Sequence, residues 1–360
     1  MKQTLKRITA FLLMALLLAP TLISCGGVDT SAAVTYEKES VSKALFQYLC
    51  CLEKTEYLYE AYGVDSSSVS SSQLEDNAMI WTATDGKGAT VADSLKTDVL
   101  ESVQKLLYFK KYALDQGYVL SEENKKIIKE DFNEMIAQFE DKKEFNKEME
   151  KYGIDYDEML QYYYLQSIAW KGEDILFGED GKMKVTEKTA KDYFDDKYVT
   201  VGCIFINTKN KTFANGKVVV LPADEKAAKI ALADDVFKRA SEGEDFNALC
   251  VEYSDQGKIT EEKAKEGYTF TTGGFVNETA EKKAFEMKKG EVVRVDTDGG
   301  VYILQRRALN GSYFETEKEK IITQIEDLKK YSLVNAAAEK FEMKEEFLNE
   351  LDIAALPHVV

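Results

Sequence analysis

One stretch, residues 198–307, constrains the fold of this chain more than any other. It opens with a β-branched, alternating run at residues 199–206, which predicts a strand. Apolar residues at helical spacing follow at 224–242 and predict an amphipathic helix. After these come a short helix at 245–253, a helical patch at 280–287 and a last strand at 301–305. The order predicts a small sheet flanked by helices.

The same stretch carries five short motifs in a fixed order. They are Gly-Glu-Asp-Phe-x-x-Leu at 243–249, Tyr-Ser-Asp at 253–255, Gly-Gly-Phe at 273–275, Ala-Phe-x-Met-Lys-Lys-Gly-Glu-Val at 284–292 and Gly-Val-Tyr-Ile-Leu at 300–304. In this order they resemble a parvulin-type peptidyl-prolyl isomerase domain. The resemblance implies a small antiparallel sheet with flanking helices over residues 184–309.

The first residues are typical of a targeting signal and not of a folded segment. Lys2, Lys6 and Arg7 form a basic start, and an apolar stretch at 8–22 is short for a membrane span. The tetrapeptide Leu22-Ile23-Ser24-Cys25 then resembles a bacterial lipobox. This implies a lipoprotein signal peptide at 1–24, acylation of Cys25, a tether at 25–35 and anchoring on the extracytoplasmic face of the cell membrane. An ordinary secretory signal with an incidental cysteine is the alternative.

Composition restricts the remaining function classes. Hydrophobic residues make up 44% of the chain and charged residues 31%, which is typical of a globular protein with a solvated surface. The formal net charge of −17 repels phosphate backbones, so nucleic acid is excluded as a partner. The spacing of the four cysteines other than Cys25 suggests neither a disulfide framework nor a zinc site, and we expect buried free thiols at Cys50, Cys51, Cys203 and Cys250.

The sequence pattern before residue 184 predicts a domain made of helices. Apolar residues at helical spacing predict helices at 35–62, 92–116, 121–140, from Asp155 to about Trp170, and 187–197. The runs at 112–121, 152–155 and 185–194 are similar to the N-terminal chaperone domain of extracytoplasmic foldases of the PrsA and SurA type. In that family a C-terminal segment packs back onto the N-terminal helices.

The expected architecture is therefore α+β, with a discontinuous helical domain that receives the parvulin-like domain as an insertion. The helical chaperone-like part covers 36–183, and the C-terminal helices cover 310–360, with residues 313–353 expected to be helical. Homodimerisation is possible.

The catalytic positions implied by the parvulin resemblance are not those of the family. Its two buried histidines fall on Cys203 and Tyr302, and its carbonyl-facing Cys or Asp falls on Gln256. Its proline slot falls on Val276 and Ala280, where Phe275 could partly replace the lost ring. The single histidine of the chain, His358, is near the C-terminal end, and we expect it to be solvated. We predict no confident catalytic residue, no cofactor and no metal.

Because no catalytic residue is predicted, we expect the protein to act by binding other polypeptides. Successive helical residues are about 100° apart, so Tyr162, Tyr163 and Tyr164 cannot all share one face, and at least one must meet solvent or a cleft. We take these tyrosines, Trp170 and Phe275 as candidates for client binding, with core packing as the alternative for each.

Three hypotheses follow. The first is a membrane-anchored extracytoplasmic chaperone or foldase that binds unfolded secreted polypeptides and carries a degenerate parvulin-like domain. The second is an active peptidyl-prolyl isomerase with an atypical site. The third is a surface lipoprotein that binds one dedicated partner.

Overall fold

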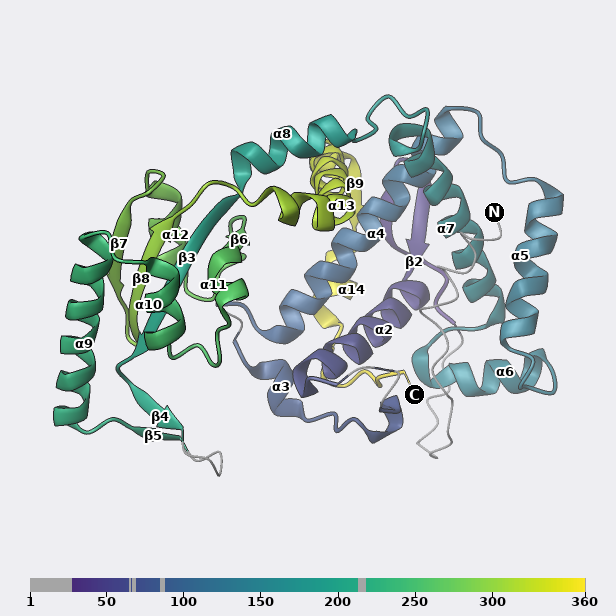
Figure 1. The fold of residues 1–360 in the computed structure, drawn as a ribbon. Coiled ribbons are helices and arrows are strands. Elements are labelled where there is room, and N and C mark those ends of the chain that lie inside the picture. Colours follow the sequence, from purple (N-terminus) through teal and green to yellow (C-terminus); the bar gives the residue numbers. More distant parts are fainter. Residues whose placement is uncertain (1–27, 65, 67–68, 85–87, 213–217, 360) are drawn as a thin grey trace. The chain divides into compact units, whose positions relative to one another are not determined.

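The computed structural model describes residues 28–64, 66, 69–84, 88–212 and 218–359. The expected leader, the acylation candidate Cys25 and the first part of the tether lie outside the described residues. The chain divides into two compact units, one formed by Met1–Lys184 with Glu326–Val360 and the other by Val185–Ile325. We call the first the helical unit and the second the sheet unit; their elements are labelled in Figure 1.

The helical unit begins with a β-hairpin, although the sequence predicted a helix from Thr35. Strand β1 (Ala32–Tyr36) pairs antiparallel with β2 (Glu39–Ser42) and, on its other side, with β9 (Phe341–Met343). The ring centroids of Tyr36 and Phe341 are 4.5 Å apart across the second pair. The helix prediction is wrong for residues 35–42, and within 313–353 it is wrong at β9, which separates α13 (Gly311–Ala336) from α14 (Glu345–Glu350). Strands of three to five residues leave too little alternation to compete with the helical spacing beside them.

Three long helices form the body of this unit. Helix α2 (Lys43–Tyr62) starts where the Ser42 hydroxyl accepts a bond from the Leu45 amide, and it ends at Gly63, whose φ of +63° favours glycine. Helices α4 (Val91–Asp115) and α7 (Tyr156–Phe177) lie against each other. A Cβ at position 172 of α7 would lie 2.0 Å from the Phe109 carbonyl oxygen of α4, so this close approach requires Gly172.

Shorter elements complete the helical unit. They are η1 (Ser71–Gln73), α3 (Ala78–Thr82), α5 (Glu122–Met135), α6 (Lys142–Met149), η2 (Glu150–Tyr152), η3 (Ala338–Lys340) and α14 (Glu345–Glu350).

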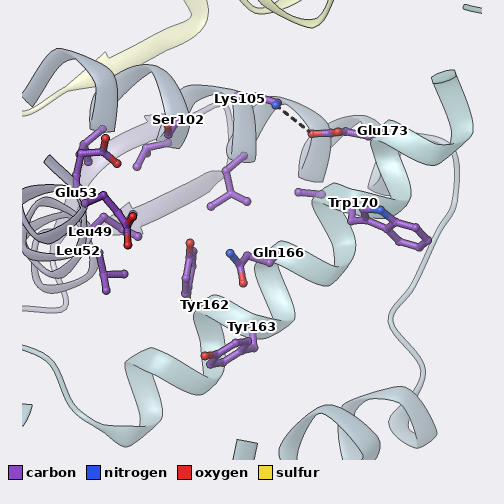
Figure 2. Close-up of a pocket in the computed structure, with 15 residues that line it drawn as sticks. Leu49, Leu52, Glu53, Ser102, Lys105, Tyr162, Tyr163, Gln166, Trp170 and Glu173 are labelled. Atoms are coloured by element: carbon purple, nitrogen blue, oxygen red, sulfur yellow. Dashed lines mark ion pairs between the residues drawn. The ribbon is translucent and has the colours of Figure 1, made fainter. Parts of the chain in front are cut away.

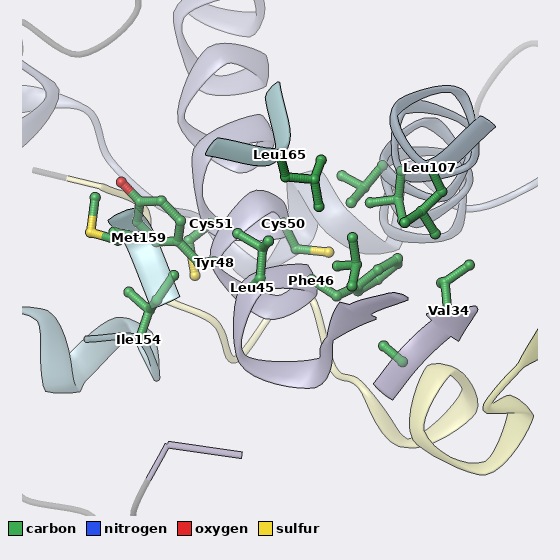
Figure 3. Close-up of a cluster of buried hydrophobic side chains, with 14 of the residues drawn as sticks. Val34, Leu45, Phe46, Tyr48, Cys50, Cys51, Leu107, Ile154, Met159 and Leu165 are labelled. Atoms are coloured by element: carbon green, nitrogen blue, oxygen red, sulfur yellow. The ribbon is translucent and has the colours of Figure 1, made fainter. Parts of the chain in front are cut away.

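The core of the helical unit contains two of the cysteines. Cys50 and Cys51 are buried and free among the apolar side chains of α2, α4 and α7 (Figure 3). Burial raises the pKa of the Cys50 thiol, and it raises that of Cys51 to about 12. Both are therefore neutral at physiological pH and act as small apolar side chains. Cys203 and Cys250 are likewise buried and free, so the expectation of buried free thiols is confirmed.

The residues after α14 are held in the helical unit by one buried lysine. The Lys54 ammonium group, with none of its surface exposed, donates hydrogen bonds to the carbonyl oxygens of Ile353 (3.0 Å), Ala354 (3.1 Å) and Leu356 (2.5 Å). Asp76 supplies the counter-charge at 2.8 Å. The backbone groups of the C-terminal tail thereby replace the water that a lysine ammonium otherwise requires.

His358 also lies within this arrangement. Its Nε2 is 3.2 Å from the Ser71 carbonyl oxygen, and its side chain is only 15% exposed. The expectation of a solvated terminal histidine is wrong, because docking of the preceding residues on Lys54 carries His358 against η1.

The sheet unit is built on a four-stranded antiparallel sheet with the order β6-β3-β8-β7. Its strands are β3 (Val199–Asn207), β6 (Tyr268–Phe270), β7 (Val292–Asp296) and β8 (Gly300–Arg306). Helices α9 (Ala223–Ser241), α10 (Phe246–Tyr253) and α11 (Glu261–Glu266) bury one face, and α12 (Glu278–Glu286) buries the other. A separate hairpin joins β4 (Asn210–Thr212) and β5 (Val218–Val220). Together the two units make an α+β protein.

Helix α13 (Gly311–Ala336) belongs to both units. Its first half packs with α8 (Glu187–Lys197) in an apolar cluster that includes Phe194, Phe314 and Ile321. Farther along α13, the Lys330 ammonium pairs with Glu173 of α7 at 2.6 Å. The second boundary therefore follows Ile325, later than the 309 expected from the sequence, because a boundary inside one continuous helix leaves no break in the sequence pattern.

Candidate functional site

The two positions expected to carry histidines lie on one face of the central strand pair. Cys203 of β3 stands opposite Leu304 of β8, and Tyr302 stands opposite Phe205, so Cys203 and Tyr302 are diagonal neighbours. Both are buried in the apolar cluster under α12. Burial raises the pKa of each group, and the neighbouring Cys203 raises that of Tyr302 further. A neutral thiol and a neutral phenol therefore occupy these positions at physiological pH.

Gln256 lies beside this pair. Its Oε1 accepts a hydrogen bond of 3.1 Å from the Tyr268 hydroxyl of β6. Its side chain also lowers the pKa of Cys203 by hydrogen bonding, an effect smaller than that of burial. The structure thus brings Cys203, Gln256 and Tyr302 together, and the amide of Gln256 is already engaged by Tyr268, which the sequence analysis did not identify.

The expected proline-slot positions do not line a common slot. Val276 is 80% exposed, whereas Ala280 is completely buried at the start of α12. Phe275 packs on Phe270 with ring centroids 4.7 Å apart, and its ring centroid lies 6.0 Å from that of Tyr302. Phe205 joins this group at 4.6 Å from Tyr302. We call Phe205, Phe270, Phe275 and Tyr302 the aromatic face; alternation along β3 was the signal that could have placed Phe205 there.

A buried carboxylate fixes the position of Phe275. Both oxygens of Glu281 in α12 accept backbone hydrogen bonds of 2.8 Å, one from Gly273 and the other from Phe275. Glu281 is only 7% exposed. Because a carboxylate that accepts two amide protons resists displacement, Glu281 holds the Gly-Gly-Phe segment against the sheet. The sequence gives no sign of this role, since a glutamate in a first helical turn is common on protein surfaces.

The helical unit contains an open apolar groove between α2, α4 and α7, with a volume of about 500 Å³ (Figure 2). Aliphatic and aromatic side chains form its floor, and they include Leu49, Leu52, Val99, Val103, Leu106, Tyr162, Tyr163, Ala169 and Trp170. Trp170 is 44% exposed.

The groove receives only part of the tyrosine run. Tyr162 and Tyr163 line it, whereas the Tyr164 hydroxyl lies 3.4 Å from the Lys125 carbonyl oxygen of α5. The run is divided between two sides of α7, as the helical spacing predicted. Burial raises the pKa of Tyr162 to about 12, so its hydroxyl stays protonated. Of the client-binding candidates, Tyr162, Tyr163 and Trp170 meet in this groove, Tyr164 does not, and Phe275 belongs to the sheet unit.

The rim of the groove is acidic. Burial, followed by repulsion from neighbouring carboxylates, raises the pKa of Glu53 and of Glu56 on α2. Glu173 pairs with Lys105 at 3.8 Å, the ion pair drawn in Figure 2. Inside the groove, Oε1 of Gln166 is buried, and no residue that the structure describes forms a hydrogen bond with it. The groove thus combines an apolar floor, excess negative charge and one unused acceptor.

Comparisons with known proteins agree on one family of relatives. Residues 183–308 match the family described as the PPIC-type PPIase domain. The chain is 28% identical to a protein named foldase protein PrsA from Caldanaerobacter subterraneus subsp. tengcongensis, over 71% of this chain and 70% of that protein. It is 30% identical to foldase protein PrsA from Bacillus subtilis, over 47% of this chain and 48% of that one.

Solved structures give similar names. A Bacillus cereus peptidylprolyl isomerase (PrsA) covers 75% of this chain with 91% of its own, at 20% identity and a TM-score of 0.34. PrsA from Bacillus subtilis covers 75% with 92% of its own, at 21% identity and a TM-score of 0.25.

Proposed function

We propose that this chain, which carries a PPIC-type parvulin domain and resembles the PrsA foldases, is a membrane-anchored extracytoplasmic chaperone that binds unfolded secreted polypeptides. Its groove in the helical unit holds apolar and aromatic segments of the client, and its parvulin domain contributes little isomerase activity. The anchor is an acyl group on Cys25. Among the described residues, no helix has the length and apolar character needed to cross a membrane.

The open groove is the observation that carries this proposal. An unfolded chain exposes the apolar side chains that a folded one hides, and burying one Val, Leu, Ile, Phe or Met contributes about 1.5–3 kcal/mol. A groove of about 500 Å³ accommodates only a few such side chains at once. Binding through a few apolar contacts is weak and reversible, as release of a folding client requires. The acidic rim favours segments in which lysine or arginine flanks the apolar residues.

The names of the relatives support the same function. Both curated relatives are named foldases. The leader and the lipobox-like residues before Cys25 support a location on the extracytoplasmic face of the cell membrane.

Low isomerase activity follows from the chemistry at the parvulin positions. An isomerase accelerates rotation about an X-Pro bond when it binds the proline ring and stabilises the twisted amide. Cys203 and Tyr302 are neutral and buried, and Gln256 is bonded to Tyr268. An active isomerase is the second candidate, and the aromatic face favours it, because Phe275 and Tyr302 could pack on a proline ring.

Suppression of client aggregation tests the chaperone proposal. The chain starting at residue 26, which keeps every described residue, should slow aggregation of unrelated unfolded proteins, and Trp170→Ala should weaken this several-fold. Tyr331→Ala is the matched control, because Tyr331 is a 53% exposed aromatic of α13 that does not line the groove. Equal effects of the two substitutions, or no suppression by the unmodified chain, would reject the groove as the client site.

A further inference from the structure

A second hollow lies in the sheet unit, where β8 ends. Its volume is about 390 Å³, and it is lined by Asn247, Lys265, Lys289, Gly290, Gln305, Arg306, Arg307 and Ala308. Four of these side chains are cationic and two are amides, and no carboxylate lines the hollow. In a chain of net charge −17, so many unopposed cations around one hollow require an explanation.

The four cations lack the carboxylate partners that the other two arginines of the same unit have. Within the part of the chain that the structure describes, no carboxylate lies within 4.0 Å of Lys265, Lys289, Arg306 or Arg307. By contrast, Arg239 and Arg294 of the same unit each contact two carboxylates. No ion pair within the described residues therefore neutralises the positive charge at the hollow.

Arg307 is fixed in place by neutral groups. Its Nη1 donates to the carbonyl oxygens of Ala264 (2.7 Å) and Lys265 (2.9 Å), and its Nη2 donates to Oδ1 of Asn247 (2.6 Å). These acceptors orient the guanidinium without an ion pair, and Asp245 acts on its charge only from a distance beyond 4.0 Å. The Arg307 side chain is therefore a rigid cationic wall of the hollow.

Arg306, which also lines the hollow, has a hydrogen-bond donor without a partner among the described residues. The donor is Nη1 of Arg306, and it is buried. Burial lowers the pKa of its guanidinium, with no nearby acidic group acting in the opposite direction. A buried donor without a partner is costly and rare, and an acceptor on a ligand in the hollow would satisfy it if the guanidinium turned toward that ligand.

We propose that this hollow binds the phosphate group of an anionic ligand. Arginine and lysine donors recognise phosphate oxygens with short, charge-assisted hydrogen bonds, and a phosphate would supply both the missing charge and acceptors. The phosphate belongs either to a free phosphate ester or to a phospholipid headgroup. This inference is independent of the proposed chaperone function, because the groove belongs to the other unit.

Titration with inorganic phosphate tests the proposal directly. The chain starting at residue 26 is titrated at constant ionic strength, with chloride replaced by phosphate, and amide resonances are followed by NMR. Saturable shifts confined to residues around 289–291 and 305–308 are expected. Arg306→Gln should weaken binding about tenfold, and the double substitution Lys265→Gln with Lys289→Gln should do the same. The double variant alters two exposed side chains, so it keeps the test valid if Arg306→Gln fails to fold.

The matched control is Lys226→Gln, which removes one exposed cation of α9 outside the hollow and should change affinity less than about twofold. A second arm measures sedimentation with vesicles of phosphatidylcholine, with and without phosphatidylglycerol. Binding to the anionic vesicles that the double variant loses identifies a headgroup as the source, whereas saturable phosphate binding without vesicle binding identifies a free ester. Absence of saturable binding in both arms, or equal affinity of the double variant and Lys226→Gln, would overturn the proposal.

Discussion

In the helical unit, the groove leaves Trp170 partly exposed and the Gln166 acceptor unused, whereas in the sheet unit the aromatic face closes on itself, with Phe275 packed on Phe270 and beside Tyr302. The two regions also differ in origin. The groove belongs to a unit built from both ends of the chain, while the aromatic face comes from the continuous stretch between β3 and β8. We therefore predict that the proposed client binding and any isomerase activity are separable, because they would depend on different segments and on different polar groups.

Deletion of residues 326–360 should separate the two regions most completely. It removes β9 from the edge of β1 and takes the tail carbonyls away from Lys54, which leaves a buried ammonium without most of its partners. We expect the helical unit to lose cooperative unfolding and the sheet unit to keep it, because Val185–Ile325 contains all strands of its own sheet. Hydrogen exchange read separately in α2 and β3 measures this. Protection of α2 equal to that in the intact chain would contradict a helical unit that depends on both chain ends.

Asp76→Asn should produce the next largest effect. It removes the counter-charge of Lys54 and leaves the buried ammonium with neutral carbonyl partners alone, which we expect to lower the free energy of unfolding by about 3 kcal/mol. The matched control is Asp157→Asn, which breaks a surface pair of 2.6 Å with Lys142 and should cost less than about 1 kcal/mol. Urea unfolding followed in the helical unit measures both. Similar losses in the two variants would show that Lys54 draws its stability from the carbonyls alone.

The two regions were predictable from the sequence to different degrees, because long helices and short strands differ in how clearly their residue patterns repeat. Long helices repeat their pattern over many turns, so α2, α4 and α7 were predictable, although the α2 prediction included the hairpin and α7 continues from Trp170 to Phe177. Pairing of β1 with β9 was not predictable, because short strands far apart in sequence carry no shared periodicity.

Single side chains show the same division. The tyrosine run indicated that α7 meets a cleft, because three consecutive aromatic residues cannot share one helical face. Lys54, Gln166 and Glu281 were not identified, since a buried lysine, glutamine or glutamate has the same letter as a solvated one. Val276 was expected in a slot by motif counting, but a count along the chain does not determine which way a loop residue faces, and this one is exposed.

Glu56→Gln should sharpen the contrast in charge between the groove and the aromatic face. Burial and repulsion by Glu60, one helical turn away, raise the pKa of Glu56 above its usual value of 4.5. A raised folded-state pKa means that the folded protein binds this proton more tightly than the unfolded one, so the contribution to stability is largest below pH 4.5 and is lost as pH rises through the folded pKa.

The variant should therefore be more stable than the parent above that pKa by about 0.2–0.5 kcal/mol, the usual size of an i,i+4 like-charge repulsion, and equal to it at low pH. Unfolding curves at several pH values between 4 and 8 measure the difference. The same substitution at exposed Glu134 of α5 is the control. A variant less stable than the parent at neutral pH would show that the Glu56 carboxylate is favourable where it lies.

Tyr302→Phe should have the smallest effect, and it decides between the two readings of the aromatic face. The Tyr302 hydroxyl makes no hydrogen bond to any described residue, so its removal should change the free energy of unfolding by less than about 0.5 kcal/mol. Positioned acid–base groups of the usual kind contribute about 100- to 10,000-fold to a rate, and here a neutral phenol and a neutral thiol stand at those positions. We expect turnover of X-Pro peptides near the uncatalysed rate in both proteins, measured by a protease-coupled assay, with aggregation suppression unchanged.

Gln256→Ala, which releases Tyr268, is the companion variant and should also leave turnover unchanged. Efficient turnover by the parent that either substitution abolishes would establish the sheet unit as an active isomerase with an atypical site, and the separation of binding from proline chemistry would then no longer hold.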